Sequence, residues 1–282
     1  MDQLKTKDIQ ALSRAYKSAK RLVKLSNLWQ FLNTEYGIGC IDKNNLILQH
    51  TDYQQIRELI KSDMGIDISE PPLTGSRIDI AKSTGNEKLN AEAPGRHHLL
   101  LNSPSGELFI NDQLIPLIKG ASYRVDWREV DLNKIPPSII VVENLQAFDF
   151  FKSFNLPESL SHALVVYRGH NISSKAVIDF LNATSHNTQI ISFCDFDPKG
   201  FEIALSTTKV TDILLPELDQ AFDGAEGTRH VFDKQHTSVT HFSKHALPSI
   251  LYSYWNELMK QKLCVSQENI LAHSKRLLVL AL

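Results

Sequence analysis

The sequence is poor in cysteine. Only three cysteines occur in 282 residues, they lie far apart, and no CxxC pair is present. Their odd number and wide spacing exclude a disulfide framework, and the missing CxxC pairs exclude the usual zinc knuckle. We therefore expect Cys40, Cys194 and Cys264 to be buried thiols in a reducing compartment.

Long apolar segments are also absent. No apolar run approaches the roughly 18–20 residues that a membrane span needs. The first ten residues, MDQLKTKDIQ, lack the apolar stretch of a secretory signal. These absences predict a cytoplasmic protein without membrane contact. With 42% hydrophobic and 22% charged residues, the chain has the composition of a globular protein with one large or two ordinary domains.

A strong overall charge is missing as well. The formal net charge of −2 argues against a generally basic nucleic-acid-binding coat. The first 24 residues nevertheless contain a basic set, which consists of Lys5, Lys7, Arg14, Lys17, Lys20, Arg21 and Lys24. A basic helix here is suited to phosphate groups, with Lys17, Lys20 and Arg21 as candidate DNA contacts. A solvated helix face is the alternative.

The first 135 residues contain helical patterns followed by short β-rich runs. Apolar residues recur at three- and four-residue spacing over 4–33, and a second amphipathic pattern covers 52–64, so both segments are predicted as helices. Three β-rich runs follow within 97–128, separated by turn residues. This order predicts an N-terminal region, 1–135, that is either a winged-helix-like DNA-binding module or a plain helical and β scaffold.

From Pro136 onward the pattern alternates between strands and helices. Apolar strands are predicted at 138–144, 163–169, 188–197 and 210–216, with helices between them. This alternation predicts an α/β domain over 136–282, with a mainly parallel sheet, right-handed crossovers and a C-terminal helical extension.

Acidic residues follow two of these strands. Glu143 ends the first strand, and Asp195 and Asp197 end the third. The carboxyl ends of parallel strands share one sheet edge, where functional groups gather. Three carboxylates at one edge repel each other unless a cation lies between them, and oxygen ligands of this kind suit Mg²⁺ or Mn²⁺.

The aspartates also have a structural interpretation. A strand-end aspartate often caps the following helix, and Pro198 suits the first helical position, so Asp195 or Asp197 is a candidate cap. Gly200 permits a close backbone approach. The ordered set, with Glu-Asn after one strand and Asp-Phe-Asp-Pro-Lys-Gly-Phe two strands later, favours the metal site over capping alone.

These motifs carry a family resemblance. IIVVEN and ISFCDFDPKGF resemble the Toprim domain, and most of all that of JetD, the nuclease subunit of the Wadjet anti-plasmid systems, which is related to the Toprim domain of the topoisomerase VI A subunit. The resemblance implies metal binding by Glu143, Asp195 and Asp197. The late segment CVSQENIL is similar to a C-terminal segment of that family, which implies a further catalytic acid, Glu268.

The resemblance implies a metal-dependent DNA endonuclease or nickase. It also implies a homodimer that acts beside an SMC-like ATPase complex in anti-plasmid defence. It covers 136–216 and, loosely, the last twenty residues, and this chain is short for a JetD-like subunit. A non-catalytic DNA-binding or assembly subunit is the alternative. A primase or an RNA-maturation nuclease is the third hypothesis, and the missing CxxC pairs disfavour the primase.

Other polar residues follow the strands. Arg168 could hold a phosphate and His170 could assist proton transfer or contact DNA, with local loop hydrogen bonds as the alternative. Lys199 could offset charge near the metal or be simply exposed.

Two further groups carry weaker signals. The histidines at 230, 236, 241 and 245 lack the spacing of a zinc site, although His241 and His245 can share a helix face. Tyr36 and Tyr123 stand in no motif of a covalent nucleophile and are expected to be structural. The sequence therefore favours hydrolysis over a covalent tyrosine mechanism.

Overall fold

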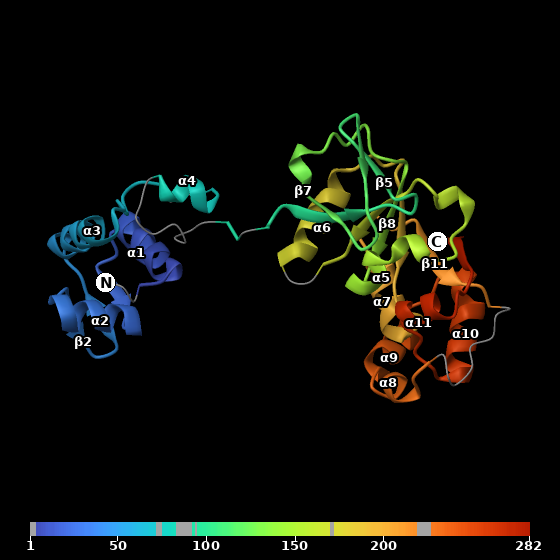
Figure 1. Cartoon of the computed structure of the whole chain (residues 1–282). Coiled ribbons are helices and arrows are strands. Elements are labelled where there is room, and N and C mark those ends of the chain that lie inside the picture. The colour runs from blue at the N-terminus through green and yellow to red at the C-terminus, as the bar shows by residue number, and fades with distance from the viewer. Residues whose placement is uncertain (1–3, 72–74, 83–91, 94, 170–171, 219–226) are drawn as a thin grey trace. The chain divides into compact units, whose positions relative to one another are not determined.

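The computed structural model describes residues 4–71, 75–82, 92–93, 95–169, 172–218 and 227–282. The chain forms two compact units, Met1–Pro94 and Gly95–Leu282 (Figure 1). The first unit has one hydrophobic core, and the second has two, one on each face of its main sheet.

The first unit packs helices against a small antiparallel sheet. Its elements are α1 (Thr6–Ser18), β1 (Leu22–Lys24), α2 (Asn27–Tyr36), β2 (Cys40–Asp42), β3 (Asn45–Ile47), α3 (His50–Met64) and α4 (Arg77–Ala81), with the strand order β1–β3–β2. The core includes Leu12, Leu32 and Ile56, which are almost completely buried.

The continuous helix predicted over 4–33 is wrong in its middle. Helix α1 ends at Ala19, which adopts a left-handed conformation (φ 42°) and donates its N–H to the Tyr16 carbonyl. Residues 22–24 then pair with β3, and Val23 and Leu25 pack on the core from this strand and the segment after it. The apolar spacing continues through the break, so periodicity alone did not reveal it.

The second unit is built on a seven-stranded mixed sheet, ordered β12–β11–β10–β8–β9–β4–β7. Its strands are β4 (His98–Asn102), β7 (Tyr123–Asp126), β8 (Ser138–Val142), β9 (Leu164–Tyr167), β10 (Gln189–Phe193), β11 (Asp212–Pro216) and β12 (Leu277–Ala281). The four strands predicted over 138–216 are present and pair in parallel. The flanking strands are antiparallel, so the sheet is mixed rather than mainly parallel.

Helices and a hairpin cover the two faces of this sheet. The other elements are α5 (Leu145–Asp149), α6 (Ile172–Ala183), α7 (Pro198–Leu205), α8 (Arg229–Asp233), α9 (His236–Lys244), α10 (Tyr252–Gln261), α11 (Gln267–Ala272), and the hairpin strands β5 (Glu107–Ile110) and β6 (Gln113–Pro116). Short 3₁₀ turns lie at Trp127–Glu129, Phe151–Ser153, Glu158–Leu160 and Ser249–Leu251.

The central strand β8 is buried on both faces. Ile140 and Val142 belong to the core shared with α5, α7, α10 and α11, whereas Ile139 and Val141 belong to the core shared with α6 and the β5–β6 hairpin. Figure 1 shows α8 to α11 on the same side as α5 and α7. A short, wholly apolar strand is expected in such a position.

The unit boundary differs from the predicted one. The division falls at Pro94, so the predicted boundary at residue 135 lies inside the second unit. The reason is strand pairing: β4 pairs with β9 through Leu101 and Val166, and β7 pairs with β4. The β-rich runs of 97–128 therefore belong to the α/β unit. None of the described helices is long and apolar enough to cross a bilayer.

We expect a fragment of residues 95–282 to fold on its own, because it contains the complete sheet and both of its cores. A fragment of 136–282 lacks β4 to β7, which leaves β9 unpaired on one side and exposes part of its core. Thermal unfolding followed by circular dichroism should show a cooperative transition for the longer fragment alone. Equal cooperativity of the two fragments would contradict this boundary.

Candidate functional site

The carboxyl ends of β8, β9 and β10 meet at one edge of the sheet. The Glu143 N–H donates to the Phe193 carbonyl over 3.1 Å, and the Arg168 N–H donates to the Val142 carbonyl over 2.8 Å. These bonds continue the parallel ladders just past the strands. The residues that follow the strands are therefore brought side by side, as the sequence predicted.

Asp195 lies at the centre of this edge. Its backbone N–H faces Glu143 Oε2 at 3.4 Å, and its Oδ1 accepts from the backbone N–H of Gln267 at 2.8 Å. The side-chain amide of Asn144 donates both to Asp195 Oδ1, at 2.9 Å, and to Glu268 Oε2, at 3.3 Å. Glu143, Asp195 and Glu268 thus lie around one another although they come from distant parts of the sequence.

Asp197 lies beside this group and caps helix α7. Its Oδ1 accepts from the Gly200 N–H at 2.6 Å, its Oδ2 accepts from Gln235 Nε2 at 2.7 Å, and only 5% of the residue is exposed. The capping role considered for both aspartates is realised by Asp197. Each carboxylate oxygen has a further lone pair, so capping leaves acceptor capacity on Asp197.

Gly200 allows helix α7 to start against the Asp195 backbone. A Cβ atom at this position would lie 1.9 Å from the Asp195 carbonyl oxygen, far inside van der Waals contact. The close approach predicted for this glycine is confirmed. Any side chain here would push α7, and with it Asp197, away from the strand end.

Burial and mutual repulsion disfavour the ionised carboxylates. The pKa of Asp195 is raised to about 7, chiefly by burial and also by the charges of Glu143, Asp197 and Glu268, against the lowering effect of the hydrogen bond from Gln267. Burial also raises the pKa of Glu143, while the positive charge of Arg168 opposes this rise. The four acids therefore act on one another electrostatically, which is the arrangement that a cation relieves.

Two buried thiols border the acids. Cys194 interacts electrostatically with Glu143 and lies 3.5 Å from the Ser192 hydroxyl, and Cys264 interacts with Asp197. Burial is the main cause that raises the pKa of both thiols, and the neighbouring carboxylates raise it further. They are therefore neutral donors. Cys40 is exposed on β2, so the expectation of three buried thiols is wrong for this residue.

The donor chemistry of the acids suits a hard divalent cation, because carboxylate oxygens converge where their charges are poorly solvated. In the described part of the chain, however, no three His, Cys, Asp or Glu side chains are arranged as a ready metal site. The carboxylates are instead oriented by amide donors, chiefly Asn144, Gln235 and the Gln267 backbone. A cation would have to draw their oxygens together.

Three residues near this edge were predicted to contact phosphate or DNA, namely Arg168, Lys199 and His170. Arg168 follows β9 and interacts electrostatically with Glu143. Lys199 is exposed, and its Nζ donates to Glu202 on the same helix at 2.8 Å, so the alternative of simple exposure fits it better. His170 lies outside the described residues.

The histidines and tyrosines that carried weaker signals are peripheral. The rings of His241 and His245 stack on α9 with centroids 4.3 Å apart, as their spacing predicted, and both residues are exposed. Tyr123 packs against the core next to α6, and Tyr36 packs against Phe31 with ring centroids 5.9 Å apart.

The sequence analysis did not identify the neutral amide side chains that hold the acids in place. Asn144 directly follows Glu143, and Gln267 directly precedes Glu268, so adjacency to the acids was an available signal. Gln235 carries no such signal. It lies 38 residues from Asp197, yet it holds both the Asp197 carboxylate and, through Oε1, the Lys199 N–H.

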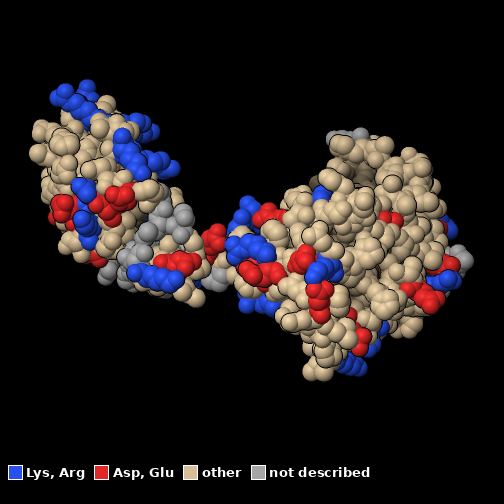
Figure 2. Space-filling model, turned by 90° about the horizontal axis from the view of Figure 1, so that it is seen from above, with Lys and Arg blue, Asp and Glu red and all other residues tan. Residues whose placement is uncertain are grey.

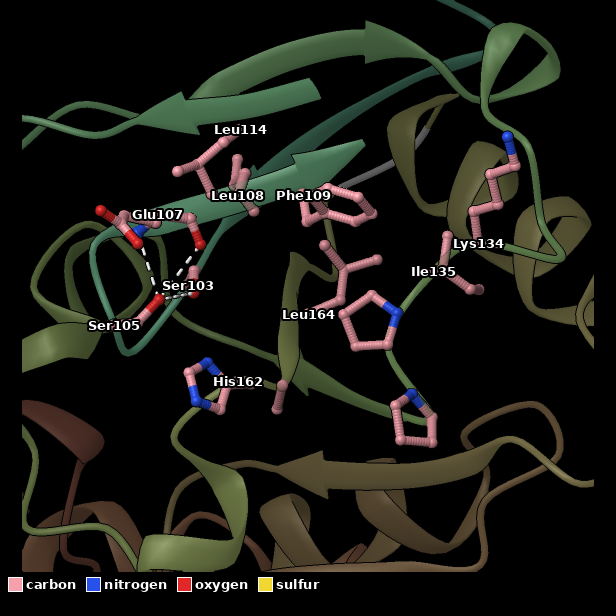
Figure 3. A pocket seen from close by; sticks show the side chains of 13 residues that line it. Ser103, Ser105, Glu107, Leu108, Phe109, Leu114, Lys134, Ile135, His162 and Leu164 are labelled. Atoms are coloured by element: carbon pink, nitrogen blue, oxygen red, sulfur yellow. Dashed lines mark hydrogen bonds between the residues drawn. The ribbon is translucent and has the colours of Figure 1, made fainter. Parts of the chain in front are cut away.

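A separate pocket of about 270 Å³ opens at the opposite edge of the sheet (Figure 3). Pro137 and Ala163, which directly precede β8 and β9, line it together with Phe109 and Leu114 of the hairpin. Five residues of β8 separate Pro137 from Glu143, a distance of roughly 17–20 Å along a strand. The pocket is mostly apolar, and Glu107 is its sole acidic lining residue, so it is distinct from the acidic edge.

The second unit coincides with a known sequence family. Residues 96–279 match the family described as Domain of unknown function (DUF7281), and the chain belongs to this family. The matched region begins close to Gly95 and ends within β12, so it spans the sheet and all four acids. Among curated proteins, none matches this chain.

We expect Asp195→Asn to stabilise the metal-free protein at about pH 8. The raised pKa means that Asp195 favours folding in its protonated form, so its contribution is present below about pH 4 and is lost as pH rises through about 7. The loss is on the order of a few kcal/mol, because one pKa unit corresponds to about 1.4 kcal/mol.

The melting temperatures of the variant and the wild type should therefore differ more at pH 8 than at pH 5. Differential scanning fluorimetry measures both, with Glu158→Gln, an exposed acid outside the site, as the control. A difference that does not grow with pH would contradict the repulsion described above.

Proposed function

We propose that the second unit is a divalent-metal-dependent nuclease of the Toprim type, which cleaves or nicks DNA phosphodiesters. The observation that carries the proposal is the clustering of four acids: the Asn144 amide links Asp195 to Glu268, Glu143 faces the Asp195 backbone N–H, and Asp197 lies beside them. The order of Glu143, Asp195 and Asp197 along the chain resembles the Toprim pattern. The neighbouring parallel strands β8 and β10 lead into these three acids, and α11 carries Glu268.

In this proposal Glu143, Asp195 and Asp197 hold Mg²⁺ or Mn²⁺, and Glu268 supports them. A cation bound there supplies charge stabilisation at the scissile phosphate and lowers the pKa of an attacking water. Arg168 then holds a phosphate oxygen beside Glu143, since guanidinium groups bind phosphate with directed hydrogen bonds. Asp197 has a second task, because it also fixes the start of α7.

The first unit is proposed to bind duplex DNA in the manner of a winged helix. Its strand order β1–β3–β2 places a β2–β3 hairpin beside β1, and helices precede and follow the hairpin. All seven basic residues of its first 24 positions are exposed, including Lys17, Lys20 and Arg21. Figure 2 shows Lys and Arg gathered along one side of this unit. Such contacts would be to phosphates rather than to bases.

The resemblance to JetD extends the proposal to the cellular role. It supports a homodimer in the cytoplasm that acts beside an SMC-like ATPase complex against plasmids. The support lies in the motifs IIVVEN and ISFCDFDPKGF and in the late acid Glu268.

We expect the full-length protein to nick supercoiled plasmid with Mg²⁺ or Mn²⁺. Asp195→Ala should reduce the initial rate at least about 100-fold, because it removes the acid on which the others converge. Gel quantification of nicked product measures the rate, and Glu158→Gln should leave it unchanged. Equal rates for wild type and Asp195→Ala would contradict a nuclease site here. A parallel RNA substrate tests the RNA-maturation alternative.

A second candidate is a DNA-binding or assembly subunit without turnover. It is favoured by the observation that both oxygens of Asp197 are engaged by Gly200 and Gln235 in a structural cap. Under this candidate the wild type binds DNA but shows no metal-dependent nicking. The plasmid assay therefore separates the two candidates.

We expect the triple variant Lys17→Gln, Lys20→Gln, Arg21→Gln to weaken DNA binding and to reduce its salt dependence. Each lost phosphate contact should lower the slope of log K against log salt by about 0.9. Fluorescence anisotropy at several salt concentrations measures this slope. The matched control is the exposed set Lys61, Arg77 and Lys82, each changed to Gln. Equal slopes for both triple variants would contradict a role for the α1–β1 segment.

A further inference from the structure

The side chain of Gln267 fills the gap between the ends of β8 and β10. It is completely buried, its Oε1 accepts from the Asn144 N–H at 2.8 Å, and its Nε2 donates to the Phe193 carbonyl at 2.9 Å. The same carbonyl accepts from the Glu143 N–H. The amide therefore continues the strand ladder as a peptide group would, with one donor and one acceptor.

The backbone of Gln267 adds a direct link to the acids. Its N–H donates to Asp195 Oδ1 at 2.8 Å, and its neighbour Glu268 shares the Asn144 amide with Asp195. The segment before it is fixed by paired backbone bonds between Phe196 and Val265, of 2.8 and 3.1 Å. Gln267 is therefore bonded directly to Asp195 and is the chain neighbour of Glu268. Its side chain also bonds the backbone of Asn144, which directly follows Glu143.

We propose that Gln267 is a positioning residue that sets the spacing of Glu143, Asp195 and Glu268 for cation binding. This inference rests on the proposed function. A neutral amide suits the task, because a lysine or arginine would neutralise the acids and compete with the cation. It also pairs the Asn144 N–H, which is costly to leave without a partner, and gives the Phe193 carbonyl a second donor beside the Glu143 N–H.

Two variants separate positioning from charge. Gln267→Met keeps the length of the side chain and removes both hydrogen bonds. Gln267→Glu keeps an acceptor for Asn144, removes the donor to Phe193 and adds a negative charge. If only charge mattered, Gln267→Glu would bind Mn²⁺ more tightly than the wild type. If position matters, both variants bind Mn²⁺ about 10- to 100-fold more weakly, as is typical when supporting residues of a metal site are lost.

The experiment measures Mn²⁺ affinity of the full chain by isothermal titration calorimetry, with the metal-free melting temperature in parallel. The matched control is Gln261→Met on α10, where the side-chain amide donates to Glu257 outside the acidic edge. The Mn²⁺ affinity of this variant should stay within twofold of the wild type. A purely structural role would lower the melting temperature and leave the affinity of the folded protein unchanged. Plasmid nicking should fall in kcat rather than in KM.

The possible outcomes test the positioning role of Gln267 and the proposed metal-dependent function separately. A wild type that does not bind Mn²⁺ overturns the proposed function and the inference with it. A wild type that binds Mn²⁺, with Gln267→Met binding within twofold, overturns the inference alone. Should Gln267→Met fail to fold, Gln267→Glu decides: weaker binding supports positioning, and equal or tighter binding overturns it.

Discussion

The main physical constraint in the second unit is electrostatic repulsion between carboxylates at one edge of its sheet. Parallel strand pairing places these carboxylates close together. Glu143 and Asp195 follow neighbouring parallel strands, and the ladder between these strands holds their backbones close together. Neutral amides from Asn144 and Gln267 compensate part of this cost by donating to the carboxylates or to the strand ends. The amides keep the edge ordered without neutralising it by a positive charge. The pKa values of Glu143 and Asp195 are raised there, and a bound cation would stabilise their ionised forms.

Much of this edge could be predicted from the sequence. Apolar runs of four to seven residues alternate with amphipathic stretches over 138–216, and this pattern gave both the four parallel strands and the position of the acids at their ends. Gly200 was predictable for the same local reason, because a glycine at the start of a helix suggests a close backbone approach.

The other features of the fold and the site depend on contacts between residues far apart in the sequence, and the local sequence pattern does not indicate such contacts. Gln267 bonds backbone atoms 74 and 123 positions away, and nothing in its neighbourhood indicates those partners. The sequence pattern of the short β-rich runs at 97–128 is the same whether they form a separate sheet or extend the main one. The pairing of β4 with β9 at Val166 shows that the first of these runs extends the main sheet. Likewise, the spacing of Leu22, Leu25 and Leu28 suits a helix, while the left-handed turn at Ala19 interrupts it.

The antiparallel pairing of β12 with β11 has a consequence for how the protein is made. Residues 264–281 supply strand β12, the Gln267 amide and Glu268, and they leave the ribosome after β8, β9, β10 and β11. The nascent chain can form its β8–β10 ladder earlier, but the acidic edge stays incomplete until residues 264–281 have emerged. A nascent chain that has exposed only β8 to β11 therefore has the strands of the site but lacks Gln267 and Glu268.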